Sequence, residues 1–137
     1  ILRRERMETN RLYSMAEKSG ITVERFDLRE NGSVSVKSGK NLYVGLDNKI
    51  SGALEKVCLA HELGHCATMS FYNIYSPLDV RGKHERRAQA WAIKKLIPKY
   101  KLSKAFKSGY DNIYSLAEYF GVTADFMQQA VDYYKEA

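Results

Sequence analysis

The sequence has only two cysteines, no long apolar run and no repeated or low-complexity segment. Cys58 and Cys66 stand eight residues apart on one predicted helix, about 12 Å along its axis, which is too far for a disulfide. Reduced thiols are typical of cytosolic proteins, and no secretory signal peptide is visible. No stretch approaches the ~18 apolar residues of a membrane span. We therefore expect a cytoplasmic protein without a membrane segment.

The length and composition fit one globular domain. The chain has 137 residues, of which 45% are hydrophobic, enough to bury a core. We predict a single domain over residues 1–137. Within it, residues 1–109 would hold a small sheet and the helices of a metal site, and residues 110–137 would form a helical pair packed on them.

The net charge of +6 is unevenly distributed. Residues 83–107 contain nine Lys or Arg and one acidic residue, whereas the remainder has thirteen basic and fifteen acidic residues. Such a basic block could attract nucleic acid or an acidic partner. It could equally be the solvated face of a helix, and we favour this second interpretation.

The most informative motif is His-Glu-Leu-Gly-His at residues 61–65. On a helix, residues four apart share a face, so His61 and His65 can supply the first two ligands of a tetrahedral zinc ion. Glu62 lies roughly 100° round the helix from His61, beside the metal, where it can deprotonate a water on the zinc. The alternative is a pair of core histidines without a metal, which would carry a heavy desolvation cost. The motif therefore predicts a metal-binding helix.

The spacing of apolar residues predicts an α+β fold. A small three-stranded antiparallel sheet, with a tight turn at Asn31-Gly32, would lay its apolar face on the motif helix, and further helices would follow, ending in a helix-turn-helix-like pair. The expected helices are residues 4–18, 51–69, 83–97, 111–120 and 123–135, and the expected strands are residues 21–28, 42–46 and a segment around Val34 and Val36.

Three further signals concern the surroundings of the motif helix. Ser51 is placed to cap its start, and Thr123 to cap the last helix. Gly64 inside the helix costs roughly 1 kcal/mol relative to alanine, which indicates close approach of a strand or a second helix. Residues 70–82 have no clean period and contain Pro and Gly, so we predict a loop that shapes a substrate cleft.

A catalytic zinc site has three protein ligands, so one more ligand is needed. Glu85 is the best candidate, because its helix face is otherwise small and apolar and an unpaired carboxylate there would be costly. His84 would point roughly 100° away and remains an alternative ligand or a substrate contact. The other acidic residues downstream that could serve are Asp79, Asp111 and Glu118.

A zinc ion held by His61, His65 and Glu85 would acidify its water and polarise a peptide carbonyl. Glu62 would take the proton from this water and deliver it to the leaving amine. A further donor would contact the developing oxyanion, and Tyr72, Tyr75 and His84 all remain open for this role. The chemistry indicated is peptide hydrolysis without a covalent intermediate.

Two blocks of sequence together resemble the ImmA/IrrE metallopeptidases, which are common in prophages and other mobile elements. The first is His61-Glu62-Leu63-Gly64-His65, and the second, about twenty residues later, is Glu85-Arg86-Arg87-Ala88-Gln89-Ala90-Trp91-Ala92 with Leu96-Ile97-Pro98. The resemblance implies a zincin-like fold with the family's glutamate ligand at Glu85. It also implies a protein substrate, a helix-turn-helix repressor encoded nearby, whose loss induces the element's genes.

Two other functions compete with the peptidase. Residues 116–130 resemble a helix-turn-helix, but the would-be recognition helix has Asp125, Gln128 and Gln129 and no arginine for phosphates, so we do not expect nucleic-acid binding. A metal-binding but catalytically idle antirepressor that sequesters its repressor is the other alternative. It would keep its activity when Glu62 is changed to Gln, whereas a peptidase would lose it.

Overall fold

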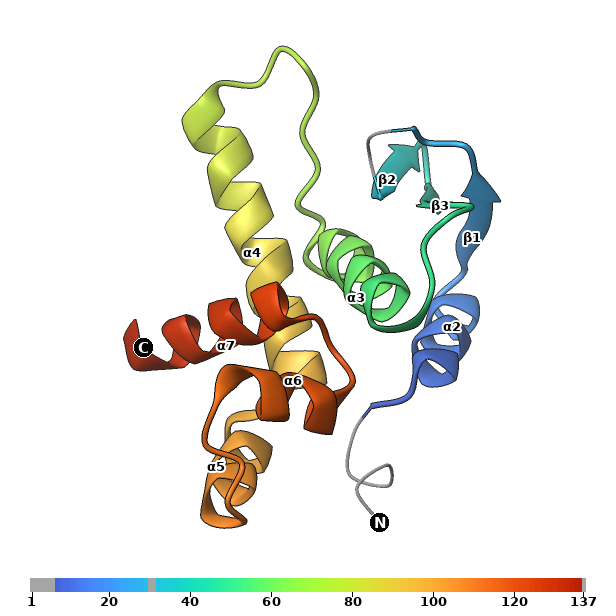
Figure 1. The fold of residues 1–137 in the computed structure, drawn as a ribbon. Helices are drawn as coiled ribbons and strands as arrows, with labels where there is room; N and C mark the ends of the chain where they lie inside the picture. Colours follow the sequence, from blue (N-terminus) through green and yellow to red (C-terminus); the bar gives the residue numbers. More distant parts are fainter. Residues whose placement is uncertain (1–6, 30–31, 137) are drawn as a thin grey trace.

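The computed structural model describes residues 7–29 and 32–136, and these residues form six helices and three strands. Figure 1 shows their arrangement. In chain order the elements are α2 (Thr9–Lys18), β1 (Ile21–Phe26), β2 (Ser33–Ser38), β3 (Asn41–Asp47), α3 (Gly52–Thr68), α4 (Leu78–Leu96), α5 (Lys99–Lys107), α6 (Ile113–Phe120) and α7 (Ala124–Glu136).

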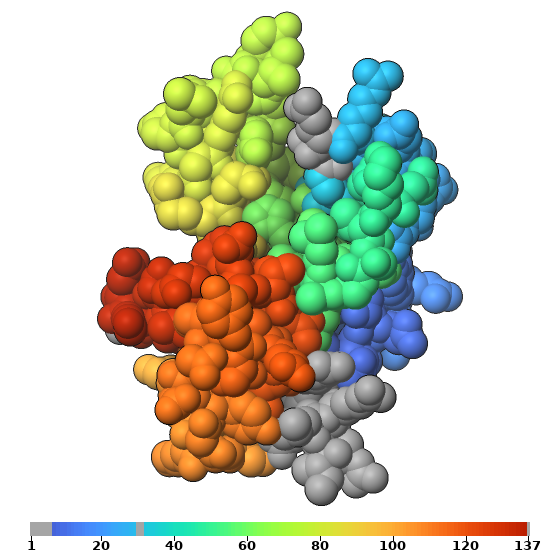
Figure 2. All heavy atoms as spheres, viewed as in Figure 1, coloured from blue at the N-terminus to red at the C-terminus, as the bar shows by residue number. Residues whose placement is uncertain are grey.

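Helix α3 lies at the centre of the molecule, with the sheet on one side and α4 on the other (Figure 1). Its residues Leu59, Ala60 and Leu63 are buried, so it is apolar on more than one face, as expected for a helix covered on both sides. Helix α7 crosses α4 and packs on α6. Seen as filled spheres, the sheet and α4 stand on opposite sides, with the C-terminal helices below them (Figure 2). The predicted α+β fold is confirmed.

The sheet is mixed, so the predicted antiparallel arrangement is wrong. Its order is β1-β3-β2, in which β3 pairs antiparallel with β2 and parallel with β1. Val44 and Leu46 of β3 are almost completely buried, and burying this most apolar strand favours the central position. Strand β1 therefore pairs with β3 rather than with its sequence neighbour. The predicted turn residue Asn31 lies outside the described residues.

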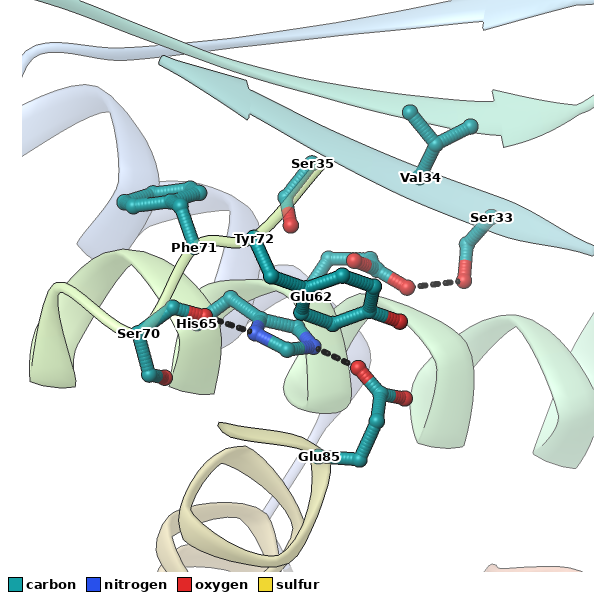
Figure 3. A pocket seen from close by; sticks show the side chains of 9 residues that line it. All are labelled: Ser33, Val34, Ser35, Glu62, His65, Ser70, Phe71, Tyr72 and Glu85. Carbon is teal, nitrogen blue, oxygen red and sulfur yellow. Dashed lines mark hydrogen bonds and ion pairs between the residues drawn. The ribbon is translucent and has the colours of Figure 1, made fainter. Parts of the chain in front are cut away.

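The polar side of β2, and not its valine side, faces helix α3. Ser33 and Ser35 stand opposite Leu46 and Val44, and both serines point toward α3 while Val34 points away (Figure 3). Because side chains alternate along a strand, fixing the apolar face of β3 inward also fixes which face of β2 turns inward. One consequence is that Ser33 of β2 can contact Glu62 of α3.

Two helices begin several residues away from their predicted first residues. Residues 7 and 8 of the predicted first helix are not helical, and residues 4–6 lie outside the described residues. Helix α4 begins at Leu78 instead of Lys83, so only residues 70–77 remain of the predicted loop. Pro77 and Asp79 explain the early start, since proline suits a helix start and an acidic residue suits the first turn.

Helix α5 was not predicted. It follows Pro98 directly, so this proline ends one helix and begins the next. The two predicted helix caps had different outcomes. Ser51 precedes α3, but its hydroxyl makes no capping bond, contrary to prediction. The Thr123 hydroxyl accepts a hydrogen bond from the Phe126 amide at 3.2 Å, which confirms its predicted cap.

The predicted C-terminal pair α6–α7 is confirmed, and a hydrogen bond connects it to α3. The buried Lys56 of α3 donates a hydrogen bond to the carbonyl of Phe120 at the end of α6, at 2.7 Å. A cation at the C-terminal end of a helix is favourable because it meets unpaired carbonyls there. Among the described residues, no helix combines the length and apolar character that a bilayer crossing requires.

Candidate metal centre

The site is assembled where α3 and α4 come closest. A Cβ added to Gly64 would lie only 2.4 Å from the backbone oxygen of Ala88, so no larger residue fits there without moving the helices. This confirms the close approach predicted from Gly64. Glu85 lies one turn before Ala88 on α4, and the contact therefore carries its carboxylate over the two histidines of α3.

The ligand atoms of His61, His65 and Glu85 all lie within 4.8 Å of one another, in an arrangement that could hold a metal ion. Glu85 Oε1 lies 3.2 Å from His61 Nε2, and Glu85 Oε2 lies 2.7 Å from His65 Nε2. The two imidazole rings meet edge to face, with centroids 4.9 Å apart and planes at 79°. The contact from Glu85 to His65 is visible in Figure 3.

Nδ1 of each imidazole has a hydrogen-bond partner outside the cluster, and this contact turns Nε2 toward the other candidate ligands. His61 Nδ1 lies 2.7 Å from Gln89 Oε1, and His65 Nδ1 lies 2.6 Å from the Ser70 carbonyl oxygen. Because these oxygens only accept hydrogen bonds, each Nδ1 carries a proton, which leaves Nε2 as the nitrogen that can exchange its own proton for a metal. Two imidazole nitrogens and one carboxylate match a catalytic zinc site, so the residues fit this metal.

A left-handed residue places the Ser70 carbonyl under His65. Met69, at the end of α3, has φ of 52°, a backbone conformation that costs a non-glycine residue about 1–2 kcal/mol. The turn brings Ser70 back so that its amide bonds the His65 carbonyl at 3.0 Å and its own carbonyl meets the His65 ring. Backbone strain here positions a candidate ligand.

Electrostatics in the cluster favour a protonated histidine pair beside an ionised carboxylate. Burial acts to lower the pKa values of His61 and His65, but hydrogen bonds to Glu85, together with those to Gln89 and Ser70, raise both pKa values above their usual range. The hydrogen bonds from the two histidines hold the pKa of Glu85 well below its usual range. The free cluster thus binds protons where a metal would bind.

Glu62 lies outside this cluster, in a cleft beside it. Its side chain is buried, and the Ser33 hydroxyl donates a hydrogen bond to its Oε2 at 2.7 Å. The cleft has a volume of about 370 Å³ and runs between β2, α3, α4 and the segment after α3 (Figure 3). Its lining residues are Ser33, Val34, Ser35, Glu62, His65, Ser70, Phe71, Tyr72 and Glu85.

The three residues considered as oxyanion or substrate contacts have different positions. Tyr72 lines the cleft, and burial and the neighbouring Glu85 raise its pKa. Tyr75 is 88% exposed and does not line the cleft. His84 stacks on Tyr72 at a centroid distance of 6.3 Å, and its Nδ1 is buried without a hydrogen-bond partner among the described residues.

The remaining ligand candidates, Asp79, Asp111 and Glu118, are not part of the cluster found among the described residues. Both cysteines are free thiols, as predicted. Burial, with a smaller contribution from Glu62, raises the pKa of Cys66 to about 11, so this thiol stays protonated at neutral pH.

Sequence reasoning missed three residues that hold the site: Gln89, Ser70 and Ser33. Gln89 follows Glu85 by four residues, so its place on the same helix face was available from spacing. The Ser70 contact uses a backbone carbonyl and depends on the turn at Met69, for which no side-chain signal exists. The contact of Ser33 with Glu62 could be predicted only with knowledge of which face of β2 turns toward α3.

Comparison with known proteins adds one match. The family model for the IrrE N-terminal-like domain, which describes a peptidase family, matches residues 16–132. This range includes the sheet, the candidate metal centre and most of the C-terminal helical pair. A search of curated proteins finds no match.

Proposed function

The chain belongs to the IrrE N-terminal-like family of peptidases, and from this membership we propose that it is a zinc-dependent endopeptidase acting on a protein substrate. The observation that carries the proposal is the convergence of His61, His65 and Glu85 beside a cleft that contains Glu62. When bound to such ligands, zinc acts as a Lewis acid toward a carbonyl and acidifies water.

Glu62 is the general base of this proposal. The Ser33 hydrogen bond holds its Oε2, which leaves Oε1 as the oxygen that takes a proton from the attacking water. Glu62 then passes this proton to the nitrogen of the leaving amine as the peptide bond breaks, so no covalent intermediate on the protein is needed. Tyr72, whose ring borders the same cleft, is the donor we propose for the developing oxyanion.

The substrate would bind as an extended strand along β2. Within the described residues β2 pairs only with β3, so its other edge has backbone groups free to pair. Ser33, Val34 and Ser35 of this strand border the cleft. An extended peptide added to this edge would gain backbone hydrogen bonds and would pass Glu62 and His65.

We further propose a helix-turn-helix repressor of a prophage or mobile element as the substrate. This proposal rests on the resemblance of residues 61–65 and 85–98 to the ImmA/IrrE metallopeptidases. A segment of the repressor that opens into an extended conformation would fit the β2 edge, because folded helices cannot offer the backbone groups that strand addition requires.

The test compares the wild type with Glu62→Gln, using the zinc-loaded protein and the repressor encoded beside its gene. We expect one zinc per chain in both, repressor cleavage by the wild type, and a rate about 10²–10⁴-fold lower in the variant, since proton transfer is lost while the ligands stay. Relief of repression by Glu62→Gln at the wild-type level would instead support the sequestering antirepressor. No zinc binding by the wild type would contradict the proposal.

A further inference from the structure

A chain of side-chain hydrogen bonds connects the candidate ligand His61 with the last helix. His61 Nδ1 lies 2.7 Å from Gln89 Oε1. The amide nitrogen of Gln89 donates to Gln129 Oε1 at 2.8 Å. One residue each from α3, α4 and α7 therefore takes part, and Gln129 lies on the exposed surface of α7.

The direction of the Gln89 amide decides which nitrogen of His61 can bind a metal. With its oxygen toward His61, Gln89 accepts the Nδ1 proton, and Nε2, which faces Glu85, is the nitrogen left to bind a metal. If the amide were reversed, its NH₂ group would donate to Nδ1 and the proton would move to Nε2. That tautomer has no lone pair to offer the metal.

Gln129 contacts this amide from the side opposite His61. Its Oε1 accepts a hydrogen bond from the NH₂ group of Gln89, and in this arrangement the Gln89 oxygen is turned toward His61. His65 needs no such contact, because its Nδ1 meets the backbone carbonyl of Ser70, which has no donor alternative. The two imidazoles of one site are therefore fixed by different means.

We propose that Gln89 is a positioning residue that sets the metal-binding tautomer of His61, and that Gln129 of α7 sets the orientation of Gln89. The inference rests on the proposed function, in which His61 is a ligand. It gives α7 a role in the metal site although no residue of α7 belongs to the ligand cluster. Outer partners of this kind change metal affinity by about 10–100-fold when they are removed.

The direct test is the tautomer of each histidine in the metal-free protein. The chain has three histidines, His61, His65 and His84, so their ring nitrogens can be assigned by NMR on ¹⁵N-labelled protein. Spectra are recorded over a pH series that extends more than about two units above the ordinary histidine pKa, because the pKa values of both rings are raised above their usual range. In the wild type we expect a proton on Nδ1 of both His61 and His65, because each of these atoms faces an oxygen that only accepts. In Gln89→Leu, His61 should become a mixture while His65 stays unchanged as an internal reference.

Zinc affinity, measured by competition with a chelator, is the second readout. We expect Gln89→Leu to weaken binding by about 10–100-fold, and Gln89→Glu to retain it, because both carboxylate oxygens accept the Nδ1 proton. Gln129→Ala should weaken binding less, and Gln129→Glu should restore it. The matched control is Gln128→Ala, since Gln128 bonds Asp132 on its own helix and should leave both readouts unchanged.

The outcomes separate this inference from the proposed function. Wild-type tautomers and wild-type zinc affinity in Gln89→Leu would overturn the inference and leave the peptidase proposal standing. A wild type without zinc binding would contradict the peptidase proposal, while the NMR comparison would still decide the role of Gln89. If Gln89→Leu fails to fold, the pair Gln129→Ala and Gln129→Glu decides: equal His61 tautomers in both would overturn the inference.

Discussion

Replacing Gly64 by alanine tests how the two ligand-bearing helices are held together. Ordinary van der Waals contact begins near 3.4 Å, but the new Cβ would lie 2.4 Å from the Ala88 oxygen and 3.1 Å from its carbonyl carbon. The neighbour is backbone and cannot rotate away, so α3 and α4 must separate by about 1 Å. Overpacking costs about 1–3 kcal/mol, and the large overlap places this case at the upper end.

Helix propensity acts in the opposite direction and sharpens the prediction. Alanine is better than glycine by about 1 kcal/mol in a helix interior, so on an open helix the same change would stabilise. We expect Gly64→Ala to lower the free energy of unfolding by about 2 kcal/mol, or roughly 5–10 °C in Tm for a domain of this size. Zinc affinity should fall at least about 10-fold, since sites of this kind tolerate only about 0.5 Å of displacement.

The assay is denaturant unfolding of the metal-free protein together with a zinc titration. Gly82→Ala on α4 is the matched control, because its Cβ would meet only the end of the flexible Arg86 side chain, at 3.1 Å. This variant should be neutral or up to about 1 kcal/mol more stable. A Gly64→Ala protein as stable as the wild type, with unchanged zinc affinity, would refute the argument from helix approach.

Three further predictions concern the cluster and the turn that follows α3. Because the pKa values of His61 and His65 are raised, protons should compete with zinc at pH values above the usual histidine pKa of 6.5. Zinc affinity, measured by chelator competition, should therefore already be falling before the pH reaches 6.5. An affinity that does not change between about pH 8 and pH 6 would contradict this. In the metal-free protein the raised histidine pKa values contribute stability that is fully present below pH 6.5 and is lost as the pH rises through the pKa values of the folded state. The lowered pKa of Glu85 contributes stability that is present above its usual value of 4.5 and is lost as the pH falls through the pKa of the folded state. Unfolding curves should therefore show the full contribution of the cluster between pH 4.5 and 6.5, and Glu85→Gln should remove that feature. Met69→Gly should relieve the left-handed strain and raise stability by about 0.5–1 kcal/mol in thermal unfolding without weakening zinc binding, and a destabilised variant would show that the Met69 side chain matters more than its backbone.

Some features follow from neighbouring residues in the chain and were predictable. The positions of His61 and His65 on one helix face depend only on helical periodicity. The same holds for Glu85 on the small, apolar face of the next helix, whose Ala88, Ala92 and Leu96 are buried. Thr123 at the start of α7 acts through a local hydrogen bond. The two spaced motifs were also sufficient to indicate the family.

Other features depend on which apolar surfaces compete for burial, and only the tertiary structure decided them. Strand β3 takes the centre of the sheet because Val44 and Leu46 are its most buried side chains, and this turns Ser33 toward Glu62. Serine and valine alternate along β2, so either the serines or the valines could face α3. The sequence of the strand alone does not distinguish these two orientations.

The contacts that orient the candidate metal ligands likewise depend on the assembled fold. Gln89 reaches His61 only because Gly64 lets α4 approach α3, and it reaches Gln129 only because α7 crosses α4. The sequence by itself determined which side chains could bind a metal, since that depends on their chemistry and local spacing. The tertiary structure decided how those side chains are oriented, because orientation is set by contacts between segments distant in the chain.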